Sequence, residues 1–496
     1  MIMKKIFVIL LAITLGIFVF MGVSTYKKGG SFLDINLSEI SETIKNKVNS
    51  IKENRKNPEI KVVEENIDIV EINSEPTLSY SERIEKGDYF FERGFLSFAI
   101  NEYVKAANLE SNRIEPYIKL LKTNYELGDY TKAKRNAEIV LKLSPNNYEG
   151  KFSLVKIYIK QSDFVSAETL IDQLISSEVE DPNLNYYRAL LKIAFDKHDE
   201  AKKIIKTLKV GLTDVELNEK LDKFLTAYQE FDFAQAGEEV YLAELLARSF
   251  NQVGEYEMAI YKLKEILKER GDLRDSWVLL GFAYLNLEKS YFALTAFEKA
   301  YDLDSEWPAT QYFLGLTYTE LSRTEDAVIF FNYALSNGFK PEIVIYRKLA
   351  DLYLDLQKYQ ESVDAYENIL DITKDDIDSF VRPIWIYLDF LQKPEDALKL
   401  AKIAHTAFPD NPLTYNLLGW SYLGLKNYTE AEKQLIMAIE LDPNMAAAHY
   451  NLGNLYFAKD DIDNASGMYQ KAYELDQNGS IGKLAAKKYN ELLSVE

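Results

Sequence analysis

The sequence predicts an all-α protein, a solenoid of about eleven helical hairpins preceded by one transmembrane helix. A small residue returns every 34 or 35 residues along most of the chain. Around these positions, apolar residues recur at spacings of three and four, which places them on one face of a helix. Near the N-terminus, Ile6 to Val23 is an apolar run of 18 residues, about the length needed to cross a bilayer.

The small residue defines the repeat. It stands at Ala99, Ala133, Ala167, Ala201, Ala259, Ala293, Ala327, Ser362, Ala397, Ala431 and Ala465, so ten of eleven positions are alanine. One step is longer than the others, because Ala201 and Ala259 are 58 residues apart. Since a fixed period of this length indicates stacked repeats, the long step predicts an insertion of about 24 residues.

Each repeat predicts two amphipathic helices that pack on each other. The fullest examples are Trp277, Leu280, Gly281, Tyr284, Ala293, Phe297 and Ala300, and then Tyr415, Leu418, Gly419, Tyr422, Ala431, Leu435, Ala438 and Pro443. Gly281 and Ala293 are small where two helices approach closely, whereas Tyr284 and Phe297 fill the space between them. Pro443 ends the second helix. The pattern resembles the tetratricopeptide repeat family.

This resemblance covers about Tyr80 to Glu496 and implies a right-handed superhelix whose inner groove binds peptides or partner proteins. In such repeats the second, fifth, ninth and twelfth positions of each first helix face the groove. The residues selected in this way are Phe282, Tyr312, Leu316, Arg347, Arg382, Trp420, Leu423, Tyr450, Asn454 and Phe457. The aromatic members would form a protein-binding surface or simply belong to the core. The two arginines would meet acidic groups of a partner or form solvated ion pairs.

The predicted domain organisation follows from the repeat. The segments are 1–28, a signal anchor or transmembrane helix; 29–79, a polar tether; 80–209, a block of about four repeats; 210–239, an inserted helix; 240–479, a block of seven repeats; and 480–496, a C-terminal capping helix. The inserted helix is predicted from an apolar stripe that includes Leu217, Leu221 and Phe224.

The N-terminal segment is interpreted as a membrane anchor. Lys4 and Lys5 precede the apolar run, which is longer than the core of most cleaved signals, so an uncleaved anchor is favoured over a cleaved signal peptide. The array is then expected outside the cytoplasm, in a periplasm. Within the tether, Leu37, Ile40, Ile44, Val48 and Ile51 form a stripe. Residues 37–51 are expected to lie on the membrane or on the first repeat, or to self-associate as a short coiled coil.

Composition excludes several classes of function. The net charge of −20 argues against nucleic acid as a partner. The chain has no cysteine and three widely separated histidines, and it shows no phosphate-binding loop, nucleophile elbow or metal motif. We therefore expect no enzymatic activity, no cofactor and no metal. Chaperone docking is also disfavoured, because no repeat pairs lysine at the fifth position with asparagine at the ninth.

The sequence thus favours a membrane-anchored protein-binding scaffold with proteins or peptides as partners. We expect it to organise an envelope-associated multiprotein complex, such as an outer-membrane, secretion, cell-wall or periplasmic flagellar collar assembly. A cytoplasm-facing membrane adaptor with the opposite topology is the alternative. An enzyme with an unrecognised site is a third interpretation.

Overall fold

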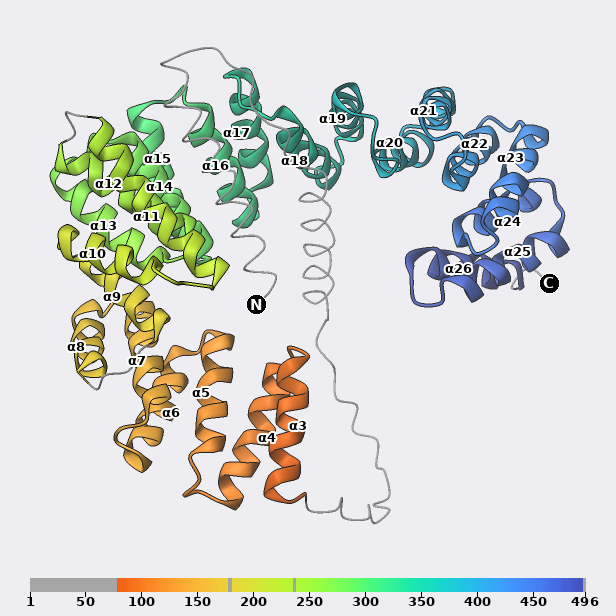
Figure 1. The fold of residues 1–496 in the computed structure, drawn as a ribbon. Helices are drawn as coiled ribbons and strands as arrows, with labels where there is room; N and C mark the ends of the chain where they lie inside the picture. Colours follow the sequence, from red (N-terminus) through yellow and green to blue (C-terminus); the bar gives the residue numbers. More distant parts are fainter. Residues whose placement is uncertain (1–77, 177–180, 235–237, 494–496) are drawn as a thin grey trace. The chain divides into compact units, whose positions relative to one another are not determined.

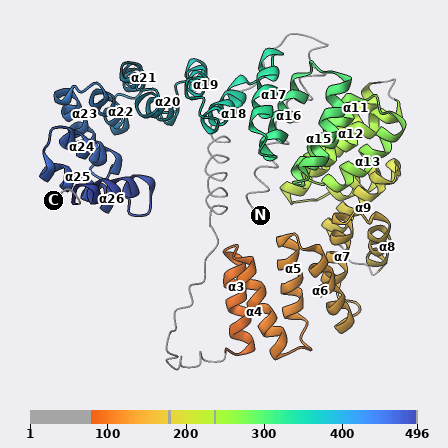
Figure 2. The same ribbon diagram turned by 180° about the vertical axis from the view of Figure 1, so that it is seen from behind.

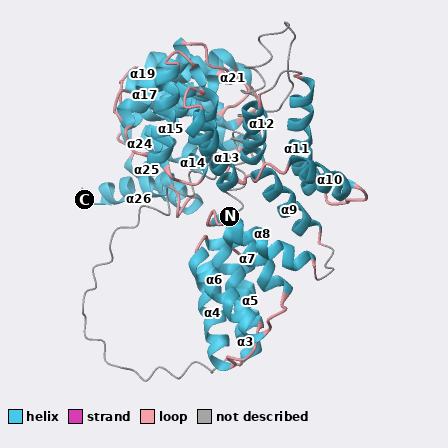
Figure 3. Cartoon of the chain, turned by 90° about the vertical axis from the view of Figure 1, so that its left-hand side faces the viewer, coloured by secondary structure: helices cyan, strands magenta, loops and turns pink. Residues whose placement is uncertain are grey.

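A computed structural model describes residues 78–176, 181–234 and 238–493, which form 24 helices and no strand (Figure 3). The helices are α3 (Tyr80–Glu92), α4 (Leu96–Leu109), α5 (Glu115–Leu127), α6 (Tyr130–Leu143), α7 (Tyr148–Lys160), α8 (Phe164–Ile175), α9 (Pro182–Ala194), α10 (His198–Lys209), α11 (Val215–Phe233), α12 (Glu239–Gln252), α13 (Tyr256–Glu269), α14 (Arg274–Asn286), α15 (Ser290–Leu303), α16 (Pro308–Glu320), α17 (Thr324–Ser336), α18 (Glu342–Asp355), α19 (Tyr359–Ile372), α20 (Asp378–Asp389), α21 (Pro394–Ala407), α22 (Pro412–Gly424), α23 (Tyr428–Leu441), α24 (Ala446–Ala458), α25 (Ile462–Leu475) and α26 (Ser480–Leu493). The all-α class is confirmed.

Most helices pack as consecutive pairs. Of the 24 described helices, 22 form eleven pairs, from α3 with α4 to α24 with α25, and each pair is followed by the next in chain order (Figure 1). The other two are α11, which packs on α10 and α12, and α26, which packs on α24 and α25.

The chain divides into two compact units, the first ending at Asp304 and the second beginning at Ser305. The second unit contains α16 to α26 (Figure 2). The division lies inside the predicted block 240–479, and α11 lies within the first unit because it packs on a helix at either end. The domain boundaries given above stay predictions.

The predicted anchor within residues 1–28 and nearly all of the tether at 29–79 lie outside the described residues. Across the described ranges, no helix combines enough length with enough hydropathy to span a bilayer.

The same backbone conformation turns the chain inside every hairpin. Gly94, Gly128 and Gly254 adopt positive φ at these turns, where the lack of a side chain removes the steric cost. The other eight turns place a residue other than glycine there, namely Ser162, Asp196, Glu288, Ser322, Gln357, Gln392, Lys426 and Asp460. These eleven positions follow the spacing of the small-residue series, with steps of 34 or 35 residues and one step of 58 between Asp196 and Gly254, so the turn is part of the repeat.

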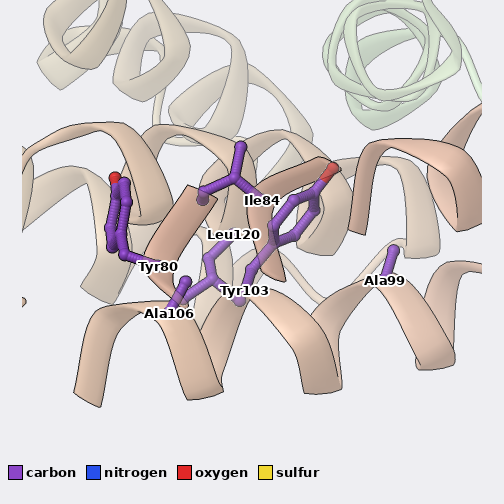
Figure 4. Packing of buried hydrophobic residues seen from close by; sticks show 6 residues of the cluster. All are labelled: Tyr80, Ile84, Ala99, Tyr103, Ala106 and Leu120. Carbon is purple, nitrogen blue, oxygen red and sulfur yellow. The ribbon is translucent and has the colours of Figure 1, made fainter. Parts of the chain in front are cut away.

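The core follows the repeat pattern as well. All eleven residues of the small-residue series are fully buried, and the hydroxyl of Ser362 donates a hydrogen bond of 2.7 Å to the Ala350 carbonyl. In the first hairpin, Ile84 and Tyr103 meet Leu120 of the next (Figure 4). A Cβ atom at Gly281 would lie 2.6 Å from the Phe297 ring, so glycine is needed for this close approach.

Candidate protein-binding groove

The ten predicted groove residues differ widely in exposure. Phe282 is fully buried, and Tyr312 is 8% exposed with its ring stacked 4.4 Å from Phe339, so both belong to the core. The half-buried members are Leu316, Arg347, Trp420, Leu423, Tyr450 and Asn454. Arg382 and Phe457 are exposed. Phe282 and Tyr312 therefore do not contribute to an exposed aromatic surface, contrary to the prediction.

Some of the half-buried residues also serve the core. The Asn454 carbonyl oxygen accepts a hydrogen bond of 2.8 Å from the Tyr469 hydroxyl, and Tyr450 packs on the same ring at 5.8 Å. Leu423 packs against the buried cluster around Leu435. These three side chains have a structural role whether or not a partner reaches them.

A cavity of about 190 Å³ lies on the first unit, across the first helices of three successive hairpins. It is lined by Phe91 of α3, by Leu121, Lys122, Tyr125 and Glu126 of α5, and by Ser153 and Lys156 of α7. Phe91 and Tyr125 occupy the twelfth position of their repeats, and Lys122 and Lys156 the ninth. The position rule therefore points here too, but the prediction selected no groove residue from the first three repeats and missed these side chains.

Lys156 gives this cavity its chemical character. Its ammonium lies 5.2 Å from the centre of the Tyr125 ring and 5.3 Å from that of Phe152. Among the described residues no ion-pair partner is found for it, whereas the neighbouring Lys122 pairs with Glu149. Burial lowers the pKa of Lys156, and Glu126 partly offsets this effect. A half-buried ammonium between aromatic rings can bind a carboxylate while apolar atoms pack beside it.

A second polar cluster lies at the end of α7. The Lys160 ammonium is 2.9 Å from Glu257 and 3.6 Å from Glu255, both at the start of α13. Burial acts to lower the pKa of Lys160, but the two carboxylates outweigh it and hold that pKa well above its ordinary value. Burial raises the pKa of Glu255. These ion pairs hold α13 against α7, which is a structural role.

Further contacts hold α13 from the other side. Lys262 of α13 lies 2.6 Å from the carboxylate of Asp196, in the turn between α9 and α10. The Tyr261 ring packs edge-on against Phe164 at 5.1 Å and against Phe195 at 6.5 Å. In the first unit, the fifth hairpin thus contacts the third hairpin as well as the hairpins next to it in the chain.

No group of three or more histidine, aspartate or glutamate side chains in the described ranges is arranged to hold a metal ion. The prediction that the protein has no cofactor or metal stays a prediction.

The fold and the hairpin geometry define a helical-repeat protein. Models of the tetratricopeptide repeat match residues 125–191, 275–306, 345–376, 387–445 and 416–480. Tetratricopeptide repeat protein 37 of Xenopus laevis is 32% identical over 113 residues, which are 21% of this chain and 7% of that protein. The match thus spans a small part of that relative. The chain contains tetratricopeptide repeats.

Two solved structures are similar at low identity. Yeast Tom70 is 16% identical and the match covers 84% of this chain and 96% of that one, with a TM-score of 0.28. The C-terminal part of a repeat protein from Cytophaga hutchinsonii is 13% identical, with coverage of 50% and 98% and a TM-score of 0.38. At these identities and TM-scores the two likenesses carry no conclusion about function.

Proposed function

We propose that the chain is a non-enzymatic protein-binding scaffold and that the cavity across α3, α5 and α7 binds a segment of a partner protein. The observation that carries this proposal is the ammonium of Lys156, which is half-buried between two aromatic rings on a concave surface and forms no ion pair with any described residue. Tetratricopeptide repeats in the chain support protein partners, because arrays of this kind present extended binding surfaces.

The partner segment is expected to carry an acidic group flanked by apolar side chains. Lys156 would receive the carboxylate, while Phe91 and Tyr125 would cover the apolar atoms. The chain as a whole has a net charge of −20 and repels acidic partners at long range. Salt screens this long-range repulsion, so we expect partner binding to strengthen as salt is added until the repulsion is screened. Short-range contacts, and not long-range attraction, would hold the partner.

We expect Lys156→Gln to weaken partner binding about tenfold to a hundredfold, the effect of losing one charge-assisted hydrogen bond. A photocrosslinking residue at Tyr125 would first capture the partner in cells, and isothermal titration with the purified partner would measure the change. Lys134→Gln is the matched control, because Lys134 also lies over a ring, that of Tyr158 at 4.8 Å, but on α6 outside the cavity. Equal affinities of both variants would exclude the cavity as the binding site.

We also propose that residues 1–28 anchor the scaffold to a membrane and that the array lies outside the cytoplasm, where it organises an envelope-associated complex. The support is the apolar run from Ile6 to Val23 behind two lysines. The outer-membrane, secretion, cell-wall and periplasmic flagellar collar settings all fit a tethered array. The cytoplasm-facing adaptor is the second candidate, since Lys27 and Lys28 balance the charges on the other side of the run.

Fusions to the C-terminus would decide the topology. A fused alkaline phosphatase, which is active only outside the cytoplasm, is expected to be active, and a fused fluorescent protein that folds only inside is expected to be dark. Deletion of residues 6–23 should release the fusion from the membrane fraction. The reverse pattern of reporter activity would establish the cytoplasm-facing adaptor, and membrane binding without residues 6–23 would contradict the anchor.

A further inference from the structure

Four aromatic rings gather at the turn of the first hairpin. This aromatic patch consists of Tyr89, Phe90, Phe95 and Phe98; Tyr89 is 52% exposed, Phe95 53% and Phe98 60%. The Phe90 ring lies 5.4 Å from that of Phe98 and 6.5 Å from that of Phe95. The Arg93 guanidinium lies 3.6 Å above the Tyr89 ring. Contiguous apolar rings half in water form a patch of the kind that often serves as an interaction surface.

The other hairpins show that the repeat does not require these rings. The residues at the two positions equivalent to Phe95 and Phe98 are Asp129 and Lys132, Asp163 and Ser166, Lys197 and Glu200, Glu255 and Met258, Lys289 and Phe292, Arg323 and Asp326, Lys358 and Glu361, Lys393 and Asp396, Asn427 and Glu430, and Asp461 and Asn464. Only the first hairpin places apolar residues at both.

Phe95 also lacks the polar side chain that caps the second helix in four of the other hairpins. At its position, Asp129, Asp163, Asn427 and Asp461 each accept a hydrogen bond from the first turn of the following helix. Phe95 begins α4 without such a bond. Six other hairpins also lack this cap and have lysine, arginine or glutamate at the position. The first hairpin differs from all of them because it places an exposed aromatic ring there.

We propose that the aromatic patch is the docking site for residues 37–51 of this same chain, through the stripe of Leu37, Ile40, Ile44, Val48 and Ile51. A helix with five apolar residues on one face is not stable alone in water, so this stripe is expected to pack against another surface. The proposal does not depend on the groove described above. If residues 37–51 dock in this way, the first repeat lies close to the predicted anchor and is not separated from it by the full length of the predicted tether.

The length of the connecting chain fits this occupant. Residues 52–79 would join the segment to α3, and a flexible chain of 28 residues spans roughly 30 Å. The patch lies at the far end of α3, about 20 Å from its first residue. The segment therefore reaches the patch without an extended linker.

The size of the patch favours a tethered occupant over a second copy of the chain. At the exposures given above, three rings offer roughly 300 Å² of accessible surface. A stable free dimer buries about 800 Å² on each partner, so the patch alone is too small. A segment on a short linker has an effective concentration in the millimolar range, at which a contact of this size is sufficient.

Disulfide trapping in the full-length protein tests the contact directly, since the natural chain contains no cysteine. We expect Ile44→Cys with Phe98→Cys to form an intramolecular disulfide under mild oxidation in lipid nanodiscs. Ile44→Cys with Phe292→Cys is the matched control, because Phe292 occupies the same repeat position in the sixth hairpin and is 61% exposed. Equal yields for the two pairs, or a disulfide between two chains, would overturn the proposal.

Hydrogen exchange provides an independent measurement. Phe95→Asp with Phe98→Lys installs the residues of the second hairpin and should leave the fold intact. If residues 37–51 are docked for nine-tenths of the time, the natural protein exchanges there about tenfold more slowly than this variant. Identical exchange in the two proteins would refute docking. Loss of binding to anionic phosphatidylglycerol vesicles without a change in exchange would instead assign the patch to the lipid surface.

Discussion

Replacing Lys160 by alanine is expected to destabilise the first unit by about 3 kcal/mol, at the lower end of the cost of breaking a buried ion pair. Lys160 lies between two carboxylates that are themselves buried, with Glu255 8% and Glu257 7% exposed. Without the ammonium, both carboxylates remain at one site in a region of low polarity. They must then repel each other, take up a proton or separate, and each outcome costs stability. The lysine side chain is 18% exposed, and entry of water keeps the expected cost from being larger.

The loss should appear first where α13 meets α7, since this contact joins hairpins that are not neighbours in sequence. Hydrogen exchange followed peptide by peptide is the suitable measurement, because a chain with two compact units need not unfold in one step. We expect faster exchange in α7 and α13 and little change in α16 to α26. Glu257→Gln added to Lys160→Ala should restore part of the stability, because it removes one of the two carboxylate charges that lost their ion-pair partner.

Lys122→Ala is the matched control for this prediction. Lys122 also pairs with a glutamate, Glu149, but their side chains are 53% and 38% exposed. An ion pair this exposed contributes about 0–1 kcal/mol. Similar small effects for Lys160→Ala and Lys122→Ala would mean that the buried cluster does not hold α13 in place.

The sequence predicts the local structure well because local structure is what repeats. The spacing of Ala259, Ala293 and their equivalents reports close helix packing within and between hairpins, and the all-α class follows from it. The contact between α7 and α13 has no such signature, because Lys160 and Glu257 are 97 residues apart and ordinary charges in their own repeats. It depends on how far the array turns from one hairpin to the next.

The groove illustrates a second limit. A position within a repeat indicates the direction of a side chain, but exposure depends on how closely the next hairpin approaches. Phe282 and Lys156 both occupy the ninth position, yet Phe282 is fully buried and Lys156 lines a cavity. Two of the residues selected by position, Phe282 and Tyr312, are core residues for this reason. The less regular early repeats contain the more accessible site.

Phe297→Ala is expected to destabilise the first unit by about 3–5 kcal/mol, the usual cost of truncating a buried phenylalanine. The Phe297 ring is fully buried and lies over Gly281 of the facing helix. Phe292 lies on the same helix, five residues earlier, and is 61% exposed. The Phe292 ring stacks on that of Tyr284 at 5.3 Å, so Phe292→Ala is expected to cost about 0.5–1.5 kcal/mol, well below the loss at Phe297. Hydrogen exchange followed peptide by peptide across α14 and α15, which belong to the same unit, would measure both variants.

The cavity left by this truncation allows a sharper test of the packing itself. Gly281→Ala in the natural protein places a Cβ atom 2.6 Å from the Phe297 ring and should be destabilising. In the Phe297→Ala background the same methyl group enters empty space, and alanine is favoured over glycine inside a helix by about 1 kcal/mol. The effect of Gly281→Ala should thus change sign between the two backgrounds. The same sign in both would show that the glycine is not required by the ring, and the explanation of the repeated glycine and aromatic pair would fail.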